Sequence, residues 1–410
     1  MRRLRYALAA GVLAALAACA KPPPPAADDG AARYAAMRDA CLQGPPDAAS
    51  RDARITACSF VIVSDKVTPT DMLAALRLRA GLYSAAGKLS DAAQDYDTVV
   101  RQDPRDAGAA RALGDVQRHL GRCAQAVESY DRAIRLEPKS AGAFEARADA
   151  YECQHDPTKA IADIDQAIRL EPHAADLYRK RGMLNAERGE TRQAADDFDQ
   201  ALQIRPHDVA ALLGRGEAYY KLAHYTQALA DFDSAVQLAP RSAEALYRRA
   251  GTHFQLDQFA DAITDDTAAI RLSPRLADAY DGRGSAYART GEYDKAIADF
   301  DAAIRLNPTL AAAFYHRANI YAQKGIYQRA IADYTQAIKL EPGFTPAIVN
   351  RANAYSAHGD YDLAIQDYER AVTLDPGNAQ AEQGLRQARL ERTKQASAKD
   401  IAIVPNPAAK

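Results

Sequence analysis

The stretch ADAYDGRGSAYARTGEYDKAIADFDAAIRLNPTL, residues 277–310, contains the pattern that decides the fold of this chain of 410 residues. In each half, small or apolar residues recur every three or four positions, with Gly291 between the halves and Pro308 near the end. That spacing places the residues on one face of an α-helix. The stretch therefore predicts two amphipathic helices, with a turn at Gly291 and a stop at Pro308.

The same pattern returns at a fixed interval of 34 residues. Proline occurs at positions 104, 138, 172, 206, 240, 274, 308, 342 and 376. Residues 73–378 thus form nine repeats, numbered here 1 to 9, with positions counted from 1 to 34 within each. Position 20 is Ala in all nine, and position 8 is always Gly or Ala. These small residues allow close helix packing, and because one repeat cannot bury its apolar face alone, we expect the repeats to stack.

Two charges change together along the array. Position 7 is Arg in eight repeats, and position 23 is Asp in the same eight. Repeat 2 lacks both, because it has Leu113 and Ser129 there. The joint absence predicts an Arg–Asp pair inside each repeat, with two independent surface charges as the alternative. If the pair is partly buried, the loss of one partner strands a charge and costs more than the pair contributes.

The repeat resembles the tetratricopeptide repeat (TPR) family. The residues that carry this resemblance in repeat 7 are Tyr280, Gly284, Tyr287, Ala296, Phe300, Ala303 and Pro308. The resemblance implies an all-α fold, a right-handed superhelical solenoid of antiparallel helix pairs. The main departure is Arg at position 7, where the family usually has Leu.

The first residues predict export. Residues 1–18 contain three arginines followed by an apolar run that is too short to span a membrane as a mature helix, as in a signal peptide. Leu16-Ala17-Ala18-Cys19 resembles the lipobox of bacterial lipoproteins, which implies lipidation of Cys19; a plain signal peptide with an incidental Cys is the alternative. Ala20 stands where an inner-membrane retention signal usually places Asp. The expected location is the outer membrane, lipid-anchored, on the periplasmic side.

Four further segments lie outside the repeats. Residues 19–33 form a lipidated Cys and Pro-rich linker, and residues 34–72 a degenerate N-terminal helical hairpin. Residues 379–395 predict a C-terminal capping helix that covers the last repeat, and residues 396–410 a disordered tail.

Four cysteines remain after removal of the signal peptide and lipidation of Cys19, and an oxidising compartment favours disulfides among them. Three connectivities are possible. Cys41 and Cys58 lie on the two predicted helices of the first hairpin. Cys123 begins a second helix and Cys153 ends the neighbouring first helix, and these helices run antiparallel. We therefore expect disulfides between Cys41 and Cys58 and between Cys123 and Cys153.

Composition and motifs argue against several function classes. The net charge of -2 gives no general attraction to nucleic acid, and no local basic patch is present. The chain has no GxSxG, HExxH or P-loop motif, and its histidines are scattered. No Cys or His spacing supports zinc. We therefore expect no enzyme activity, no cofactor, no metal and no nucleic-acid partner.

The resemblance places function on the groove lined by positions 2, 5, 6, 9, 12 and 13 of each first helix. Those positions are mostly Ala, Gly and charged residues, with two exceptions. Candidate partner-binding residues in repeats 5 and 6 are Leu213, Tyr220, Tyr247 and Phe254, for which edge packing is the alternative. In the last repeats they are Tyr315, Asn319, Asn350 and Asn353, whose amides suit the backbone of an extended peptide. The two-carboxylate clamp of chaperone-binding TPR proteins is absent from the matching positions.

These observations predict a non-catalytic, membrane-anchored periplasmic scaffold. It is expected to bind a partner protein or peptide in its groove, in the assembly of an envelope complex. The alternative is an accessory scaffold of a polysaccharide export or secretion system. The identity of the partner is not encoded in any motif of the sequence.

Repeat 6 breaks the pattern twice. Asp266 replaces the aromatic residue found at position 24 in seven repeats, and His253 replaces the usual Tyr at position 11. An unpaired carboxylate at a packed position is costly, so we expect it to have a partner, and His253 is the candidate. Neutral drift in a tolerant array is the alternative.

Overall fold

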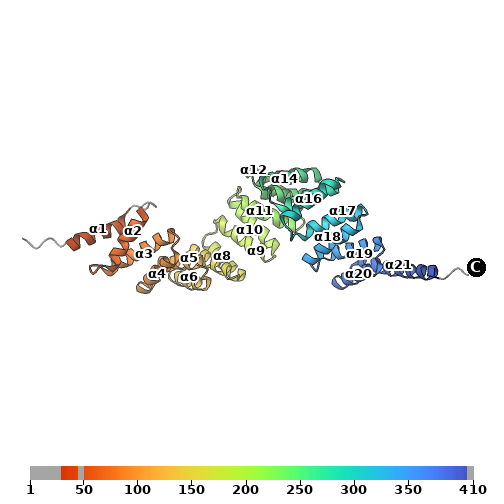
Figure 1. Ribbon diagram of the computed structural model, residues 1–410. Helices are drawn as coiled ribbons and strands as arrows, with labels where there is room; N and C mark the ends of the chain where they lie inside the picture. The colour runs from red at the N-terminus through yellow and green to blue at the C-terminus, as the bar shows by residue number, and fades with distance from the viewer. Residues whose placement is uncertain (1–28, 45–49, 404–410) are drawn as a thin grey trace, which may run out of the picture. The chain divides into compact units, whose positions relative to one another are not determined.

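The computed structural model describes residues 29–44 and 50–403, and every regular element among them is an α-helix (Figure 1). The predicted signal peptide, Cys19 and most of the linker lie outside the described residues, as do residues 404–410 of the predicted tail. The chain divides into two parts, one ending at Pro172 and the other starting at His173, and each is described by itself.

The first part contains eight helices among its described residues. They are α1 (Asp29–Gln43), α2 (Arg51–Val63), α3 (Pro69–Ala85), α4 (Leu89–Gln102), α5 (Ala107–His119), α6 (Cys123–Leu136), α7 (Ala141–Cys153) and α8 (Pro157–Leu170). Consecutive helices pack against each other, as the repeat pattern predicts.

The second part contains the remaining helices. They are α9 (Ala175–Glu187), α10 (Thr191–Ile204), α11 (Val209–Lys221), α12 (Tyr225–Leu238), α13 (Ala243–Gln255), α14 (Phe259–Leu272), α15 (Ala277–Arg289), α16 (Tyr293–Leu306), α17 (Ala311–Gln323), α18 (Tyr327–Leu340), α19 (Thr345–His358), α20 (Tyr361–Leu374) and α21 (Ala379–Ile403). In both parts, the predicted all-α array of helix pairs is confirmed.

The turn inside each repeat requires a left-handed backbone at position 15. Six repeats have Gly there, with φ between 72° at Gly121 and 94° at Gly359. The other three have His155, Ala223 and Asp257 at the same position, with φ of 58°, 60° and 57°. A non-Gly residue adopts this conformation at a cost, so the short connection between the helices imposes it. Pro at position 32 then follows the end of each second helix.

The core is built from the invariant small residues. Ala92, Ala126 and their equivalents at position 20 are at most 1% exposed throughout the array. The aromatic ring at position 24 lies over position 8, and a Cβ added at Gly216 would stand 2.7 Å from Phe232. Close approach of the helices therefore depends on these small side chains.

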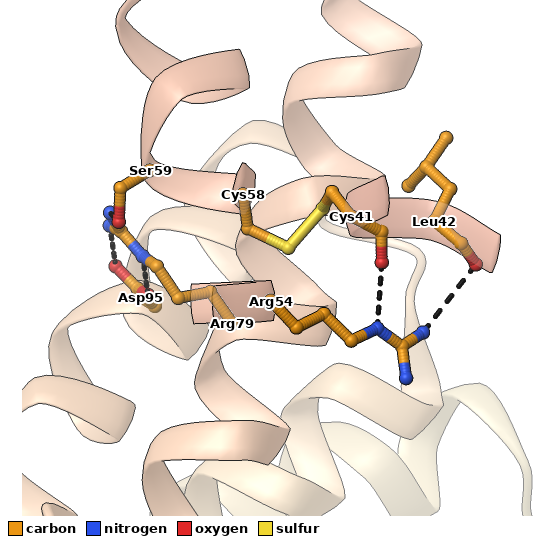
Figure 2. Close-up of a disulfide and its surroundings, with 7 residues drawn as sticks. All are labelled: Cys41, Leu42, Arg54, Cys58, Ser59, Arg79 and Asp95. Atoms are coloured by element: carbon orange, nitrogen blue, oxygen red, sulfur yellow. Dashed lines mark hydrogen bonds and ion pairs between the residues drawn. A yellow bond between two sulfur atoms is a disulfide. The ribbon is translucent and has the colours of Figure 1, made fainter. Parts of the chain in front are cut away.

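The first hairpin brings Cys41 of α1 and Cys58 of α2 to disulfide distance, with Cα atoms 4.8 Å apart (Figure 2). Both side chains are fully buried. Arg54 of α2 donates from Nε to the carbonyl oxygen of Cys41 at 2.8 Å and from a terminal nitrogen to that of Leu42 at 3.5 Å. A cation at the C-terminal end of α1 satisfies carbonyl groups that the helix leaves unpaired.

The second predicted pair also lies at disulfide distance. Cys123 is the first residue of α6 and Cys153 the last residue of α7, and their Cα atoms are 6.0 Å apart. The antiparallel packing of neighbouring helices is what brings these two ends together.

The predicted Arg–Asp pair is present in all eight repeats that have both residues. In each, the guanidinium of position 7 donates two hydrogen bonds to the carboxylate of position 23, through Nε and a terminal nitrogen. The pairs are Arg79–Asp95, Arg147–Asp163, Arg181–Asp197, Arg215–Asp231, Arg249–Asp265, Arg283–Asp299, Arg317–Asp333 and Arg351–Asp367. In repeat 2, Ser129 instead donates to Gln117 at 2.7 Å, and Leu113 is buried.

In most of these repeats the same guanidinium also reaches the preceding repeat, a contact that the sequence pattern had not led us to expect. Arg215 donates to Asp199 at 2.6 Å and Arg317 to Asp301 at 2.5 Å, and Arg351 donates to the hydroxyl of Thr335. Each acceptor is at position 25 of the repeat before. The sequence feature that could have predicted this contact is the Asp, Thr or Glu found at position 25 in every repeat. One arginine thus links three helices.

The last helix packs against α20 and buries Ala381 and Ala388 in the core of the last repeats. It runs to Ile403, past residue 395 where the sequence places its end. Within the residues that the structure describes, no helix combines the length and the apolar character needed to cross a membrane.

Candidate functional site

A cavity of about 390 Å³ opens on the groove positions of repeats 4 to 6, in the second part of the chain. Leu213 and Ala210 of α11, and Met183 and Ala186 of α9, supply apolar walls. Met183 is 49% exposed, although it is a large apolar side chain. A cavity of this size and lining has room for one apolar side chain.

The floor of this groove cavity is the ring of Phe198 from α10. The ring is buried beneath Gly214 of α11, where a Cβ would stand 2.5 Å from Phe198 Cζ. The missing side chain at Gly214, which is a groove position, therefore lets the ring line the cavity from below.

The rim of the groove cavity carries charged side chains, most of which form ion pairs. Arg248 of α13 forms an ion pair with Glu217 of α11, and Lys221 lies 3.8 Å from the same carboxylate. Arg179 of α9 lies 3.0 Å from Asp176. The cations at the rim are thus paired, whereas Glu187, which also lines the cavity and is exposed, forms no ion pair among the described residues. Apolar contact is still the main interaction that the cavity offers.

Of the four predicted residues of repeats 5 and 6, only Leu213 lines the groove cavity. Tyr220 packs edge-on against Tyr225 at 5.5 Å between ring centroids, and its hydroxyl accepts a hydrogen bond from Gln255 at 3.1 Å. Phe254 packs in the same way on Phe259, also at 5.5 Å.

Tyr247 is half-buried and packs against Leu246 and its neighbours, and burial raises its pKa to about 12. Leu213 lines the cavity, whereas Tyr220, Tyr247 and Phe254 pack against other side chains. Tyr220 and Phe254 are used within their own helical hairpins, which is the alternative that the sequence left open.

The predicted group in repeats 8 and 9 is brought together. Asn350 donates from Nδ2 to Asn319 at 3.0 Å and to the hydroxyl of Tyr315 at 3.3 Å. Tyr334 donates to Asn319 Oδ1 at 2.6 Å. Asn319, Asn350 and Asn353 line a second cavity of about 360 Å³. These amides thus use some of their hydrogen-bond donors and acceptors within the protein.

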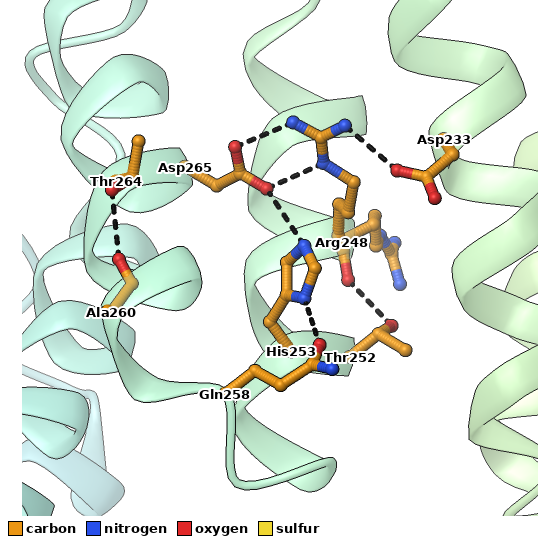
Figure 3. A network of polar contacts seen from close by, with 9 residues as sticks. Asp233, Arg248, Thr252, His253, Gln258, Ala260, Thr264 and Asp265 are labelled. Atoms are coloured by element: carbon orange, nitrogen blue, oxygen red, sulfur yellow. Dashed lines mark hydrogen bonds and ion pairs between the residues drawn. The ribbon is translucent and has the colours of Figure 1, made fainter.

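The predicted pair of His253 and Asp266 is wrong. Figure 3 shows His253 directed toward Asp265, with 3.7 Å between Nε2 and the carboxylate, while Nδ1 contacts Gln258 at 2.6 Å. Positions 23 and 24 are neighbours in one helix and point about 100° apart, so a side chain that reaches the first does not reach the second. Asp266 Oδ1 has no hydrogen-bond partner among the described residues.

Within the part of the chain that the structure describes, no three His, Cys, Asp or Glu side chains are grouped so that they could hold a metal ion. A third cavity, of about 490 Å³, lies between α4, α5 and α6 in the first part of the chain. It is lined by Leu113 and Ser129, and thus marks the repeat that lacks the Arg–Asp pair.

Family models match most of the array. Models described as tetratricopeptide repeat match residues 77–142, 148–213, 213–277, 311–344 and 346–378, and one described as TPR repeat matches residues 284–325. No curated protein matches the chain.

Solved structures share the architecture. The Cut9–Hcn1 hetero-tetramer of the APC/C matches at 15% identity over 88% of this chain and 83% of that chain, with a TM-score of 0.51. Yeast Tom70 matches at 16% identity over 92% and 99%, with a TM-score of 0.46. YrrB, described as a TPR protein with an unusual peptide-binding site, matches at 24% identity over 48% and 99%, with a TM-score of 0.42. The first of these likenesses supports the fold alone.

Proposed function

This chain belongs to the tetratricopeptide repeat family, and we propose that it is a non-catalytic scaffold that binds a partner protein or peptide in the groove of its first helices. Proteins of this family bind protein or peptide partners. The observation that carries the proposal is the groove cavity lined by Leu213, which is mainly apolar and open, with the arginines and the lysine at its rim already paired. Its partner inserts an apolar side chain there.

The apolar lining determines how strongly the cavity binds a side chain of the partner and how much the shape of that side chain can vary. Burying one aliphatic side chain contributes about 2 kcal/mol. Met183 is flexible and polarizable, so it can adjust to anchors of different shape. The apolar lining disfavours entry of a charged group into the cavity, since such a group would lose its hydration.

Leu213→Glu is therefore expected to weaken partner binding at least about thirtyfold, because it buries a carboxylate against the anchor. The matched control is Leu238→Glu, the same change at a leucine that is 42% exposed at the end of α12. Partners are captured with the full chain from detergent-solubilised envelope and identified by mass spectrometry. Their affinities for the purified variants are then measured. Equal binding by the two variants would contradict a role for the cavity.

We further propose that the scaffold is lipid-anchored at the outer membrane and faces the periplasm, where it takes part in the assembly of an envelope complex. The lipobox-like Leu16-Ala17-Ala18-Cys19 and the proline-rich linker support this. Two cysteine pairs at disulfide distance fit an oxidising compartment.

Cys19→Ser is expected to abolish acylation and to remove the chain from the outer-membrane fraction, because no thiol remains to carry the lipid. Cys58→Ser is the matched control, since it removes a thiol from the first hairpin and leaves Cys19 in place. Fractionation with mass measurement of the N-terminal peptide checks this. Normal acylated protein in the outer membrane from the Cys19 variant would refute the anchor.

A further inference from the structure

Repeat 2 has small or short side chains at three positions that carry large ones in most of the array. Position 4 is Ala110, whereas the other eight repeats have Leu, Ile, Phe or Tyr there. Position 7 is Leu113 instead of Arg, and position 11 is Gln117 instead of the Tyr found in six repeats. All three residues belong to α5 and line the cavity of about 490 Å³ between α4, α5 and α6. We call it the repeat 2 cavity.

In other repeats the same three positions bring together an arginine and two aromatic rings. The guanidinium carbon of Arg283 lies 5.7 Å from the centre of the Tyr280 ring and 5.9 Å from that of the Tyr287 ring. Positions 4, 7 and 11 of repeats 3 and 8 form the same arrangement. The array thus packs rings against a guanidinium group where repeat 2 has a cavity.

The floor of the repeat 2 cavity is apolar. Ala93 and Val100 of α4 line it together with Ala110 and Leu113, and all four side chains are buried. Ser129 stands at position 23, so the carboxylate that receives the arginine in other repeats is missing. Since an apolar cavity of about 150 Å³ holds a benzene ring, the repeat 2 cavity has room for an aromatic side chain and the backbone next to it.

Two half-buried polar groups of the lining can bond a hydroxyl group. Ser129 Oγ donates to Gln117 Oε1 at 2.7 Å. This bond leaves Gln117 Nε2 as a donor and Ser129 Oγ as an acceptor, and neither has a further hydrogen bond among the described residues. A phenol hydroxyl can accept from the first and donate to the second.

The rim carries charges of both signs, which disfavours a charged ligand. Arg101 and Asp97 of α4 pair at 2.7 Å. Arg122, Arg132 and Glu128 line the same cavity. A cation would therefore meet three arginines, and an anion would meet two carboxylates. A neutral ring instead meets guanidinium groups, which are attracted to its face.

The repeat 2 cavity is separate from the groove. Its lining comes from positions 4, 7 and 11 of α5 and from second helices and the turns before them. No lining residue stands at the groove positions 2, 5, 6, 9, 12 and 13. Binding at this cavity thus requires no groove residue.

We propose that the repeat 2 cavity binds a tyrosine side chain of a partner protein. The ring packs on Ala110 and Leu113, in the space that rings and a guanidinium group occupy in other repeats, and the arginines of the rim contact its face. The hydroxyl group bonds Gln117 and Ser129. The partner thus supplies the ring that repeat 2 lacks, in a second contact independent of the groove.

The experiment uses the full chain with labelled methyl groups and Nα-acetyl-tyrosinamide as the probe. We expect saturable ring-current shifts in the methyl resonances of Ala110 and Leu113 by NMR. Ile263 and Ile270 are the internal control, because they stand at the positions of Ala93 and Val100 but precede a repeat that has its arginine and rings. Their resonances are expected to stay in place.

Comparison probes identify the ligand class. The phenylalanine derivative is expected to bind about fivefold more weakly, because Gln117 and Ser129 then lose their partner. The leucine and arginine derivatives are expected to bind at least about tenfold more weakly than the tyrosine derivative. Tighter binding of free tyrosine than of the blocked probe would identify a small-molecule site and overturn the proposal.

Two variants test the cavity itself. Leu113→Arg, Gln117→Tyr and Ser129→Asp together restore the residues of the other repeats, so this variant is expected to fold, to fill the cavity and to weaken probe binding at least about tenfold. Gln117→Met keeps the size of the side chain and removes its amide, and is expected to abolish the preference for tyrosine over phenylalanine.

Equal binding by the triple variant, equal binding of the leucine or arginine derivative, or no shift with the tyrosine probe would overturn the proposal. The groove function is decided separately by the Leu213 variants, which lie in the other part of the chain.

Discussion

Replacing Asp266 with Asn is expected to stabilise repeat 6 at neutral pH and to leave it nearly unchanged near pH 4. The carboxyl group is buried and its pKa rises to about 8, chiefly because burial disfavours the charged form. In the unfolded chain the same group titrates near 3.8. As pH rises from about 4 to about 8, the unfolded state loses this proton and the folded state keeps it, so the free energy of unfolding falls.

The size of the effect follows from the gap between the two pKa values. Each unit of separation corresponds to 1.36 kcal/mol, so at pH 7 the cost is on the order of 4 kcal/mol. Asn is nearly isosteric and stays neutral, so it removes this cost at every pH. The cost contributed by Asp266 is therefore smallest below the unfolded pKa, and the advantage of the variant over the wild type grows as pH rises.

Native-state hydrogen exchange of the amides of α13 and α14 measures this locally, since a repeat array need not unfold as one unit. Each protection factor is corrected for the intrinsic pH dependence of exchange. Asp278→Asn is the matched control, because Asp278 is an exposed aspartate of the next repeat. If the wild type and Asp266→Asn kept parallel profiles from pH 4 to pH 8, the carboxyl group would not carry a proton in the folded state.

The break at position 24 was visible in the sequence, but its consequence depended on the structure. Asp266 is 2% exposed, and its Oδ1 has no hydrogen-bond partner among the described residues. Gly282 of the next repeat packs so closely on the carboxyl group that an added Cβ would stand 2.8 Å from Oδ2.

The period of 34 residues predicted the helix pairs, the turns and the approach of Cys123 to Cys153, because these follow from local geometry; Cys41 and Cys58, outside the repeats, were placed together by the predicted first hairpin. Backbone conformation at position 15 is one example: the turn keeps the same shape whether the residue is Gly121 or Asp257. The paired loss of Arg and Asp in repeat 2 likewise predicted an intramolecular contact. A pattern that occurs in nine repeats can be checked within one chain, because an exception in one repeat shows which residues depend on each other.

The site was harder to predict because the position of a residue in a helix determines the face on which it lies, but not which residues its side chain contacts. Tyr220 and Phe254 share position 12, and each turns to an aromatic partner at position 17 of its own repeat. An aromatic residue at position 17, such as Tyr225 or Phe259, was the signal that these rings were already occupied. Leu213 has no such partner and lines the groove cavity.

Arg317→Leu is expected to destabilise repeats 7 and 8 by about 3 kcal/mol. Its guanidinium donates twice to Asp333 at 2.8 Å, and the carboxylate is only 10% exposed. Removing the arginine strands that carboxylate, which costs more than the pair contributes. Asp301 of the preceding repeat loses the same partner, but it is 48% exposed and hydrated, so its share of the loss is small.

The chain provides its own control for this prediction. Arg317→Leu combined with Asp333→Ser copies the Leu113 and Ser129 of repeat 2, where no charge is left unpaired. The double variant is therefore expected to recover most of the loss, with a residual cost of about 1 kcal/mol from the cavity that such a repeat leaves. Denaturant unfolding with hydrogen exchange in α17 and α18 measures both. If the single and double variants were equally unstable, the stranded carboxylate would not be the cause, and packing of the arginine stem would carry the stability instead.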